Sequence, residues 1–397
     1  MSLNAGRPEP VTKRLRVAVL SRTFSKTGGG AERYSIALVE QLAARHDLHV
    51  FAQAIEHEWP GVTYHLIPTP LRKPRWINLL WFATLTWWAT RQNFDVVHSH
   101  ENTWHGNVQT VHVLPVKYNL FHGREGFRRA LRCLKVVTSP RLLTYLGLER
   151  WRYAQQDRRQ IVVTSSSLRG IMVGSYPSCE PMLSVITPGI DSPQLAQGAD
   201  ALKNTRAAAR HRLSLPATGN CLLFIANDFR KKGLNTLLDA LVRLPEDIVL
   251  AVVGNPDQKH DFSGTISKLK LDHRVFFLGR MNDISQAYLA ADCLVHPTIE
   301  DTFAMVVLEA MSYGLPCVVS GPEFCGISGL LENRVNALLL SDPRDANALG
   351  LLLQELARDT DLRRTLSVQA LSFATGYQWS ALAELQDAVY QAAHSAS

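Results

Sequence analysis

Asp301 and Glu309 stand eight positions apart in the sequence, on either side of a short apolar run. Gly314 and a proline two residues later follow this run, a pattern typical of a helix end, so we expect a helix that begins near Thr302 or Phe303. The helix directly follows a strand-like segment, and in an open parallel sheet ligands bind where the strands end. The free amides of its N-terminus, together with the helix dipole, would hold an anion such as a diphosphate.

The two carboxylates suit the two ends of such a ligand. We expect the amides of Ala304, Met305 and Val306 to take the diphosphate. Glu309 lies about 6 Å beyond Met305 on the same helix face, where it would accept ribose hydroxyls, and Asp301 would accept hydroxyls of a sugar. The spacing therefore fits a ligand built from a nucleoside, a diphosphate and a sugar. The simpler alternative is an N-cap role for Asp301 and a solvated Glu309, although the apolar neighbours of Glu309 make an unpaired carboxylate costly there.

Strand-like and helical segments alternate along the chain, which predicts an α/β fold with parallel sheets and helices on both faces. The alternation begins with the β-branched run at 15–20 and starts again near residue 221, after a segment rich in Pro, Gly and Ser. We expect an N-terminal domain over residues 1–183, a C-terminal domain over 184–375, and a last helix within 376–397 that packs back on the N-terminal domain. Residues 1–14 are expected to form a disordered lead-in.

The net charge of +7 is unevenly distributed along the chain. Residues 1–185 contain 24 Lys and Arg against 12 Asp and Glu, a net charge of +12, whereas residues 186–397 contain 18 against 23, a net charge of −5. We therefore expect the first half to meet a phosphorylated acceptor, a lipid headgroup surface or nucleic acid. The basic amphipathic segment 125–135 and the Trp-rich segment 76–91 suit peripheral contact with an anionic membrane. An ordinary core helix with a charged outer face is the alternative.

Several classes of protein are disfavoured by features that the sequence lacks. The most apolar window, 77–90, has 14 residues, whereas about 20 are needed to cross a bilayer as a helix. There is no apolar signal segment, and the six cysteines lack the spacing of a disulfide framework or a zinc site, so we expect a cytoplasmic protein with reduced thiols and no metal. Neither GxxxxGK[ST] nor GxGxxG is present, which argues against nucleotidases and dehydrogenases.

The segment 301–316, DTFAMVVLEAMSYGLP, resembles the E-x7-E signature of the retaining glycosyltransferases of family four. Further matches are GGGAER at 28–33, SVITPGID at 184–191, NDFRKKG at 227–233, VVGN at 252–255 and FFLGRMNDISQAYLAADCLVHPT at 276–298. Within the family, NDFRKKG and SPRLLTYLGLERWRY at 139–153 resemble bacterial glucosyltransferases of the lipopolysaccharide core and their relatives. Two positions depart from the signature. Asp301 replaces the usual glutamate, with Glu300 as an alternative sugar contact, and Ala304 replaces a glycine.

The resemblance implies a GT-B fold, in which two Rossmann-like, doubly wound domains face each other across a cleft. It implies a hexosyltransferase that retains the anomeric configuration and needs neither a metal nor a cofactor. Its donor would be a nucleotide-diphosphate sugar, with a UDP-sugar favoured, and its acceptor the lipopolysaccharide core or another lipid-linked or surface glycan. The catalytic residues that it implies are His112, Lys232 and Asp301. The donor-binding residues that it implies are Gly29, Gly30, Arg230, Lys231, Lys232, Met281, Phe303, Ala304, Met305, Val306 and Glu309.

Each of these residues has a plainer explanation, and the function has competitors. The basic run 230–232 could be a solvated turn, the glycine loop a tight turn, and His112 a packed core histidine. The competing functions are a GT-B enzyme with a small soluble acceptor, a nucleotide-sugar epimerase, and a non-catalytic lipid- or nucleic-acid-binding protein. The last leaves the pairing of Asp301 with Glu309 unexplained. The basic half also lacks aromatic RNA-binding signatures, so nucleic acid is not expected as a partner.

Overall fold

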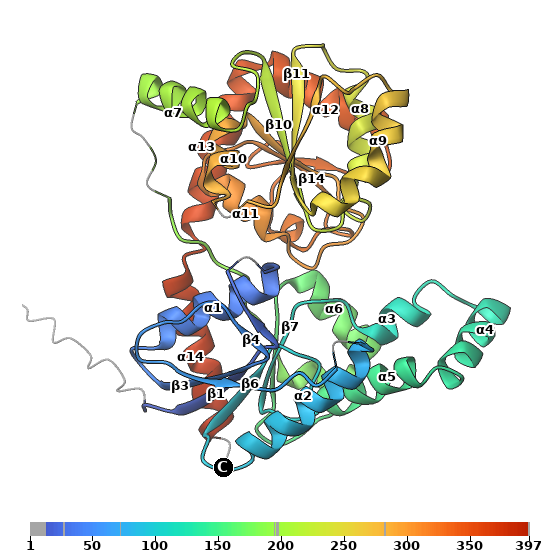
Figure 1. Cartoon of the computed structure of the whole chain (residues 1–397), viewed down its shortest axis with the longest axis vertical. Coiled ribbons are helices and arrows are strands. Elements are labelled where there is room, and N and C mark those ends of the chain that lie inside the picture. The colour runs from blue at the N-terminus through green and yellow to red at the C-terminus, as the bar shows by residue number, and fades with distance from the viewer. Residues whose placement is uncertain are drawn as a thin grey trace, which may run out of the picture. The chain divides into compact units, whose positions relative to one another are not determined.

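The computed structural model describes residues 13–26, 28–71, 73–193, 195, 198–281 and 283–395. The expected disordered lead-in, residues 1–14, lies outside these ranges except for its last two residues. The chain divides into two compact units (Figure 1). Unit 1 comprises residues 1–163, 169–186 and 383–397, and unit 2 comprises residues 164–168 and 187–382.

Unit 1 is built around a seven-stranded parallel sheet, as far as the described residues extend, with strand order β5-β3-β1-β6-β7-β8-β9. Its strands are β1 (Arg16–Leu20), β3 (Asp47–Ala52), β5 (Thr63–Leu66), β6 (Val96–Ser99), β7 (Val108–Val111), β8 (Gln160–Val163) and β9 (Leu183–Val185). Two short strands, β2 (Thr23–Phe24) and β4 (Ala54–Ile55), pair separately. The helices are α1 (Gly30–Leu42), α2 (Arg75–Thr90), α3 (Val116–Phe121), α4 (Gly126–Val137), α5 (Pro140–Arg152), α6 (Ser166–Ser175) and η1 (Pro177–Met182).

Unit 2 contains a six-stranded parallel sheet within the described part of the chain, with strand order β12-β11-β10-β13-β14-β15. Its strands are β10 (Asn220–Ala226), β11 (Ile248–Gly254), β12 (Val275–Gly279), β13 (Cys293–His296), β14 (Cys317–Ser320) and β15 (Leu338–Leu340). The helices are α7 (Ala199–Arg212), α8 (Leu234–Leu241), η2 (Pro256–Gln258), α9 (Lys259–Lys268), α10 (Ser285–Ala290), α11 (Met305–Ser312), η3 (Gly326–Leu330), α12 (Ala346–Arg358) and α13 (Thr360–Thr375).

Both faces of the second sheet are buried, and β10 shows why its sequence reads as one continuous apolar run. Leu223 and Ile225 belong to the core beneath α10 and α11, whereas Leu222 and Phe224 belong to the core beneath α8 and α9. Successive side chains of a strand point to opposite faces, so a strand covered on both sides needs apolar residues at every position. The predicted α/β class with parallel, doubly wound sheets is confirmed.

The last helix, α14 (Trp379–Ser395), belongs to unit 1 from Ala383 onward. Its polar side chains contact β6 and the turn that precedes β3. Asp387 Oδ1 lies 3.1 Å from His46 Nε2, and Tyr390 Oη lies 2.7 Å from His98 Nδ1. These four groups are buried, so the hydrogen bonds fix the position of the helix on the sheet.

Candidate active site

The loop between β13 and α11 carries the first acidic residue of the sequence motif. The predicted helix start near Thr302 or Phe303 is wrong, because α11 begins at Met305. Ala304 has a left-handed backbone (φ 72°, ψ 68°), which a right-handed helix cannot include. The carboxylate of Asp301 stabilises this turn, since Oδ1 accepts from the amides of Phe303 at 3.1 Å and Ala304 at 2.8 Å.

Of the three amides predicted to bind an anion at the start of α11, two remain available. The Ala304 amide already donates to Asp301. Among the described residues, the amides of Met305 and Val306 have no hydrogen-bond acceptor in the chain. Such unpaired amides at a helix start, with the helix dipole behind them, form an anion-binding position.

Lys232, which is distant in sequence, meets Asp301 directly. Its Nζ lies 2.6 Å from Asp301 Oδ2 and 2.8 Å from the carbonyl oxygen of Glu300. His296, the last residue of β13, places Nε2 3.2 Å from the same Oδ2. Burial acts to raise the pKa of the Asp301 carboxyl, but Lys232 and His296 outweigh it and hold that pKa far below its usual value. The carboxylate is therefore ionised at neutral pH and paired with the ammonium.

Backbone contacts between two loops bring these residues together. The Ile299 amide donates to the carbonyl of Lys231 at 2.9 Å. Gly233 (φ 84°) lies so close to the loop after β13 that an added Cβ would stand 1.9 Å from the carbonyl oxygen of Pro297. The glycine that ends the NDFRKKG motif is thus required by close backbone packing as well as by its positive φ.

The other two basic residues of the motif are more exposed than Lys232. Lys231 is 60% exposed and lies 3.5 Å from Glu300 Oε1, and Arg230 is 68% exposed and lies 3.7 Å from Asp261 Oδ2. Lys231 therefore borders the Lys232–Asp301 pair, whereas Arg230 is directed to the start of α9. Contacts this exposed contribute little to stability.

Glu309 is half-buried on α11 and has a hydrogen-bond partner on the neighbouring helix α10. Tyr288 of α10 donates its hydroxyl to Glu309 Oε2 at 2.7 Å. The Tyr288 ring is buried and stacks on Tyr313, with ring centroids 5.1 Å apart. The position of the Glu309 carboxylate is therefore set by a packed aromatic pair, while the residue itself remains partly exposed.

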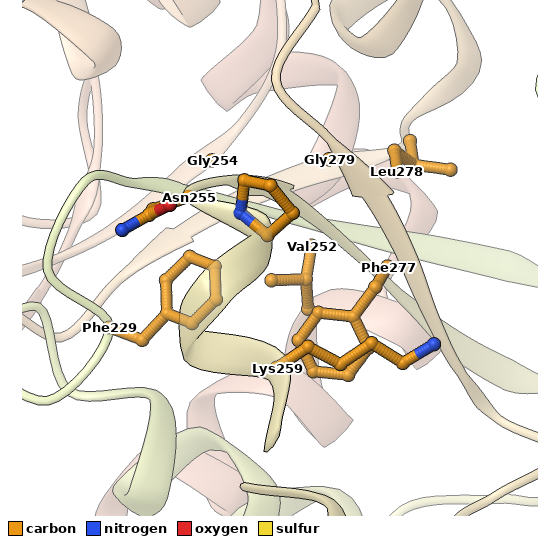
Figure 2. A pocket seen from close by; sticks show the side chains of 9 residues that line it. Phe229, Val252, Gly254, Asn255, Lys259, Phe277, Leu278 and Gly279 are labelled. Atoms are coloured by element: carbon orange, nitrogen blue, oxygen red, sulfur yellow. The ribbon is translucent and has the colours of Figure 1, made fainter. Parts of the chain in front are cut away.

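At the carboxyl ends of β11 and β12, unit 2 contains a cavity of about 280 Å³ (Figure 2). Figure 2 shows Phe229, Phe277 and Lys259 around it, whereas Asn255 and Leu278 point away. Gly279 forms part of the wall. Met281 follows two residues later and packs, half-buried, against the core beneath α11.

The three remaining predicted residues lie in unit 1. Gly29 and Gly30 open α1, with Gly29 as the N-cap residue and no side-chain cap. His112 directly follows β7, with Nε2 2.9 Å from Nδ1 of His100, and the Tyr34 ring meets it edge-on. Burial, reinforced by Arg152, lowers the pKa of His112 to about 3, so its imidazole is neutral at physiological pH.

Two residues near the site, His296 and Tyr288, were missed by sequence reasoning. A local signal existed for His296, which is a polar residue at the end of an otherwise apolar strand and stands five positions before Asp301. No comparable signal exists for Tyr288, since an aromatic residue in a helix is usually a core residue. Its contact with Glu309 depends on how α10 packs beside α11.

The basic helix α4 exposes its apolar side chains, which contradicts the alternative of an ordinary core helix. Phe127, Leu131, Leu134 and Val137 are 76%, 50%, 62% and 69% exposed. Within α4, all of whose residues are described, Val136 alone is buried. The Trp-rich helix α2 differs, because Leu79, Phe82 and Ala83 bury one of its faces while Trp87 and Trp88 remain exposed. Among the described helices, none combines the length and hydrophobicity needed to cross a bilayer.

The Lys232–Asp301 pair lies after β10 and β13, at the carboxyl ends of adjacent parallel strands, which is where open α/β sheets bind their ligands. Comparison with known proteins gives the family. The model of Glycosyl transferases group 1 matches residues 205–372, and the model of Glycosyltransferase Family 4 matches residues 28–193. The chain belongs to these glycosyltransferases and is of the GT-B type, as the resemblance predicted.

The relatives include enzymes with different names. The lipopolysaccharide glucosyltransferase WaaG of Escherichia coli K12 is 24% identical over 362 residues, covering 87% of this chain and 91% of that protein. A D-inositol 3-phosphate glycosyltransferase of Frankia alni is 26% identical over 397 residues, covering 89% and 92%.

Two solved structures show the same fold. The crystal structure of WaaG matches with a TM-score of 0.80 and 21% identity, covering 94% of this chain and 98% of that one. HepE (Alr3699) of Anabaena, in complex with UDP-glucose, matches with a TM-score of 0.74 and 18% identity, again covering 94% and 98%.

Proposed function

We propose that this glycosyltransferase is a retaining, metal-independent hexosyltransferase whose donor is a nucleotide-diphosphate sugar, with a UDP-sugar favoured. The observation that carries the proposal is the pairing of Lys232 with Asp301 beside the unpaired amides of Met305 and Val306. A cation and helix-start amides at one point are suited to a diphosphate. The complex of HepE with UDP-glucose supports the choice of base and donor.

In this proposal, the donor lies across the start of α11. The amides of Met305 and Val306 and the ammonium of Lys232 hold the diphosphate, with Lys231 at its edge. Glu309, positioned by Tyr288, accepts the ribose hydroxyls. The base lies at the loop after β12, against Met281. Phe303 and Ala304 form the buried turn that sets the direction of the two amides.

In this proposal, Lys232 pairs with Asp301 before the donor binds and with the donor diphosphate afterwards. In the structure it neutralises Asp301, and we propose that the donor diphosphate draws its ammonium away. Oδ2 of Asp301 then has a lone pair for a hydroxyl of the transferred sugar, which allows this shorter acidic residue to take the role of the usual glutamate. Glu300, 40% exposed beside Lys231, is the alternative sugar contact.

The chemical step follows from these positions. The bond between the anomeric carbon and the phosphate oxygen breaks, which leaves positive charge on the sugar and negative charge on the departing diphosphate. Lys232 stabilises that negative charge, which is greater in the transition state than in the bound donor. The acceptor oxygen bonds to the anomeric carbon on the same face, and its proton passes to the departing phosphate. No side chain is assigned as a general base.

Unit 1 is proposed to bind the acceptor and to contribute to the sugar site. His112 would face the transferred sugar as a neutral hydrogen-bonding group, since burial disfavours its charged form. Gly29 and Gly30, at the start of α1, would allow a phosphate of the donor or acceptor to approach the backbone closely. His112 therefore enters this mechanism through hydrogen bonding, without carrying charge.

We also propose an anionic glycan or glycolipid acceptor, reached at the inner face of the cytoplasmic membrane. The support comes from α4, where four exposed apolar side chains alternate with Arg128, Arg129, Arg132 and Lys135. An exposed apolar stripe bordered by basic residues is suited to the surface of an anionic bilayer. The name of the E. coli relative, a lipopolysaccharide glucosyltransferase, agrees with such an acceptor.

Membrane contact is tested by sedimentation with vesicles of phosphatidylglycerol and phosphatidylcholine. Replacing both Leu131 and Leu134 with serine removes exposed apolar surface without opening a core, so binding should fall at least tenfold. Leu351→Ser, on α12 and 67% exposed, is the matched control and should bind like the wild type. Equal binding by the Leu131 and Leu134 variant would remove α4 from the proposal.

The donor is tested by a thermal-shift panel of UDP- and GDP-sugars. A ligand that binds only the folded chain stabilises it by RT ln(1 + [L]/Kd), which is about 2.7 kcal/mol at one hundred times its Kd, and thereby raises Tm. We expect UDP-glucose or another UDP-hexose to give the largest shift without added metal. No shift with any nucleotide would refute the proposed donor site.

A small soluble acceptor is the second candidate, because the Frankia alni relative is named a D-inositol 3-phosphate glycosyltransferase. It predicts donor binding together with no affinity for vesicles. The two measurements above therefore separate the candidates.

A further inference from the structure

Four hydrogen-bond donors converge on the carboxylate of Asp301, and one of them takes no part in the proposed binding of the donor sugar or in the transfer step. Oδ1 takes the amides of Phe303 and Ala304, and Oδ2 takes Lys232 Nζ at 2.6 Å and His296 Nε2 at 3.2 Å. A carboxylate offers about four lone-pair sites, so its hydrogen-bonding capacity is filled. The residue without a role is His296.

His296 is held more rigidly than Lys232. It is the last residue of β13, is 1% exposed, and pairs in register with Val319 of β14. Its side chain has two rotatable bonds, whereas the lysine ammonium sits on a flexible four-carbon stem. Of the two donors on Oδ2, His296 is therefore the one that stays in place when the other moves.

The tautomer of His296 follows from its surroundings. Its Nδ1 is buried and has no hydrogen-bond partner within the described residues. A hydrogen on Nδ1 alone would be left without an acceptor and would turn the lone pair of Nε2 toward an ionised carboxylate. Although Asp301 favours the charged imidazole, burial lowers the pKa of His296 overall. The neutral imidazole with its hydrogen on Nε2 is the form that fits.

We propose that His296 is a positioning residue: its Nε2–H keeps the Asp301 carboxylate in one orientation while Lys232 moves between Asp301 and the donor diphosphate. This inference rests on the proposed function, in which Lys232 leaves Oδ2 when the donor binds. Without His296, Oδ2 would have no donor from the protein at that moment, and the carboxylate could rotate about its contacts to the two amides and misplace the oxygen that takes the sugar hydroxyl.

The test compares His296→Leu with His296→Gln in the acceptor-independent hydrolysis of UDP-glucose. His296→Leu removes the donor, and we expect kcat to fall about tenfold with KM within about twofold, because the carboxylate is misplaced mainly in the transition state. His296→Gln places an amide N–H near the position of Nε2 and should recover kcat to within about threefold of the wild type. Equal losses in the two variants would overturn the proposal.

A matched control separates positioning from general damage. Val295, the preceding residue, is fully buried in the core on the opposite face of the sheet. Val295→Ala should lower Tm while kcat stays unchanged. If Val295→Ala lost as much kcat as His296→Leu, any disturbance of β13 would be enough to impair the reaction. The specific positioning role of His296 would then be refuted.

A second readout needs neither donor nor turnover. Nitrogen-15 NMR of the histidine-labelled wild type, with His296→Gln to assign the signal, should show a neutral imidazole protonated on Nε2. A signal from the Nδ1–H form, or from a charged imidazole at pH 7.5, would overturn the proposal even if both variants fold poorly. If the wild type neither binds nor hydrolyses UDP-glucose, the donor assignment fails, while the NMR result still decides whether His296 donates to Asp301.

Discussion

Replacing Gly233 with alanine should separate the two loops that bring Lys232 and Asp301 together. The new Cβ would stand 1.9 Å from the carbonyl oxygen of Pro297, and real Cβ atoms essentially never approach within 3.0 Å, so the loops would have to part by more than about 1 Å. Holding an alanine in the left-handed conformation destabilises the folded chain by about 1–2 kcal/mol, and overpacking destabilises it by about 1–3 kcal/mol. We therefore expect a loss of roughly 2–5 kcal/mol in the free energy of unfolding.

The same displacement should impair the site. Lys232 Nζ now lies 2.6 Å from Asp301 Oδ2, and a shift of about 1 Å would break that contact. A misplacement of this size at a reacting centre costs up to about a hundredfold in rate, which we expect for UDP-glucose hydrolysis. The assays are urea unfolding and hydrolysis under saturating donor.

Gly264 provides the matched control. It lies within α9, and a Cβ added there would meet nothing within 4 Å. Gly264→Ala should therefore raise the free energy of unfolding by about 0.5–1 kcal/mol, as alanine does in a helix, and leave turnover unchanged. If Gly233→Ala instead matches the wild type in both stability and turnover, the close packing of the two loops is not what assembles the site.

Four further predictions concern single side chains. Lys232→Ala should lower kcat by about 10²–10³ with a smaller change in donor Kd, and normal turnover would remove Lys232 from the mechanism. Glu309→Ala should lose UDP binding while the fold persists by circular dichroism, and unchanged affinity would exclude its ribose role. Tyr288→Phe should weaken UDP binding about fivefold to tenfold, a smaller loss than that of Glu309→Ala, since the hydroxyl acts by positioning the Glu309 carboxylate, and unchanged affinity would exclude this role. Burial, with help from His112 and Arg152, lowers the pKa of His98 from 6.5 to about 3, so below pH 6.5 the unfolded chain binds a proton that the folded chain does not. The free energy of unfolding should therefore fall by up to about 1.4 kcal/mol for each pH unit below 6.5. A flat Tm between pH 6.5 and 4.5 would contradict this prediction.

The boundary of α11 shows where a local pattern stops being informative. The apolar run, Gly314 and the proline after it predict that a helix exists here, and it does. They do not predict that the chain turns left-handed at Ala304, because this turn depends on the hydrogen bonds that the Asp301 carboxylate makes to two amides. An acidic residue near a helix start reads the same in the sequence whether it caps a helix or stabilises the turn before it.

Helix α4 shows a second limit of the sequence. Its periodicity predicts an amphipathic helix, and both a core helix and an interfacial helix have that periodicity. The structure distinguishes them, because Phe127, Leu131 and Leu134 are exposed on the helix between β7 and β8. Which face of an amphipathic helix is covered depends on the neighbours that the fold supplies.

The sequence by itself determined the α/β class, the two parallel sheets and the helix that carries Glu309, because alternating apolar runs and glycine or proline stops act over a few residues. Only the tertiary structure decided that Lys232 pairs with Asp301, that His296 completes its hydrogen bonds and that Tyr288 holds Glu309. Lys232 and Asp301 are 69 residues apart. Their meeting results from adjacent parallel strands that end at the same edge of the sheet, and from a glycine that lets the two following loops touch.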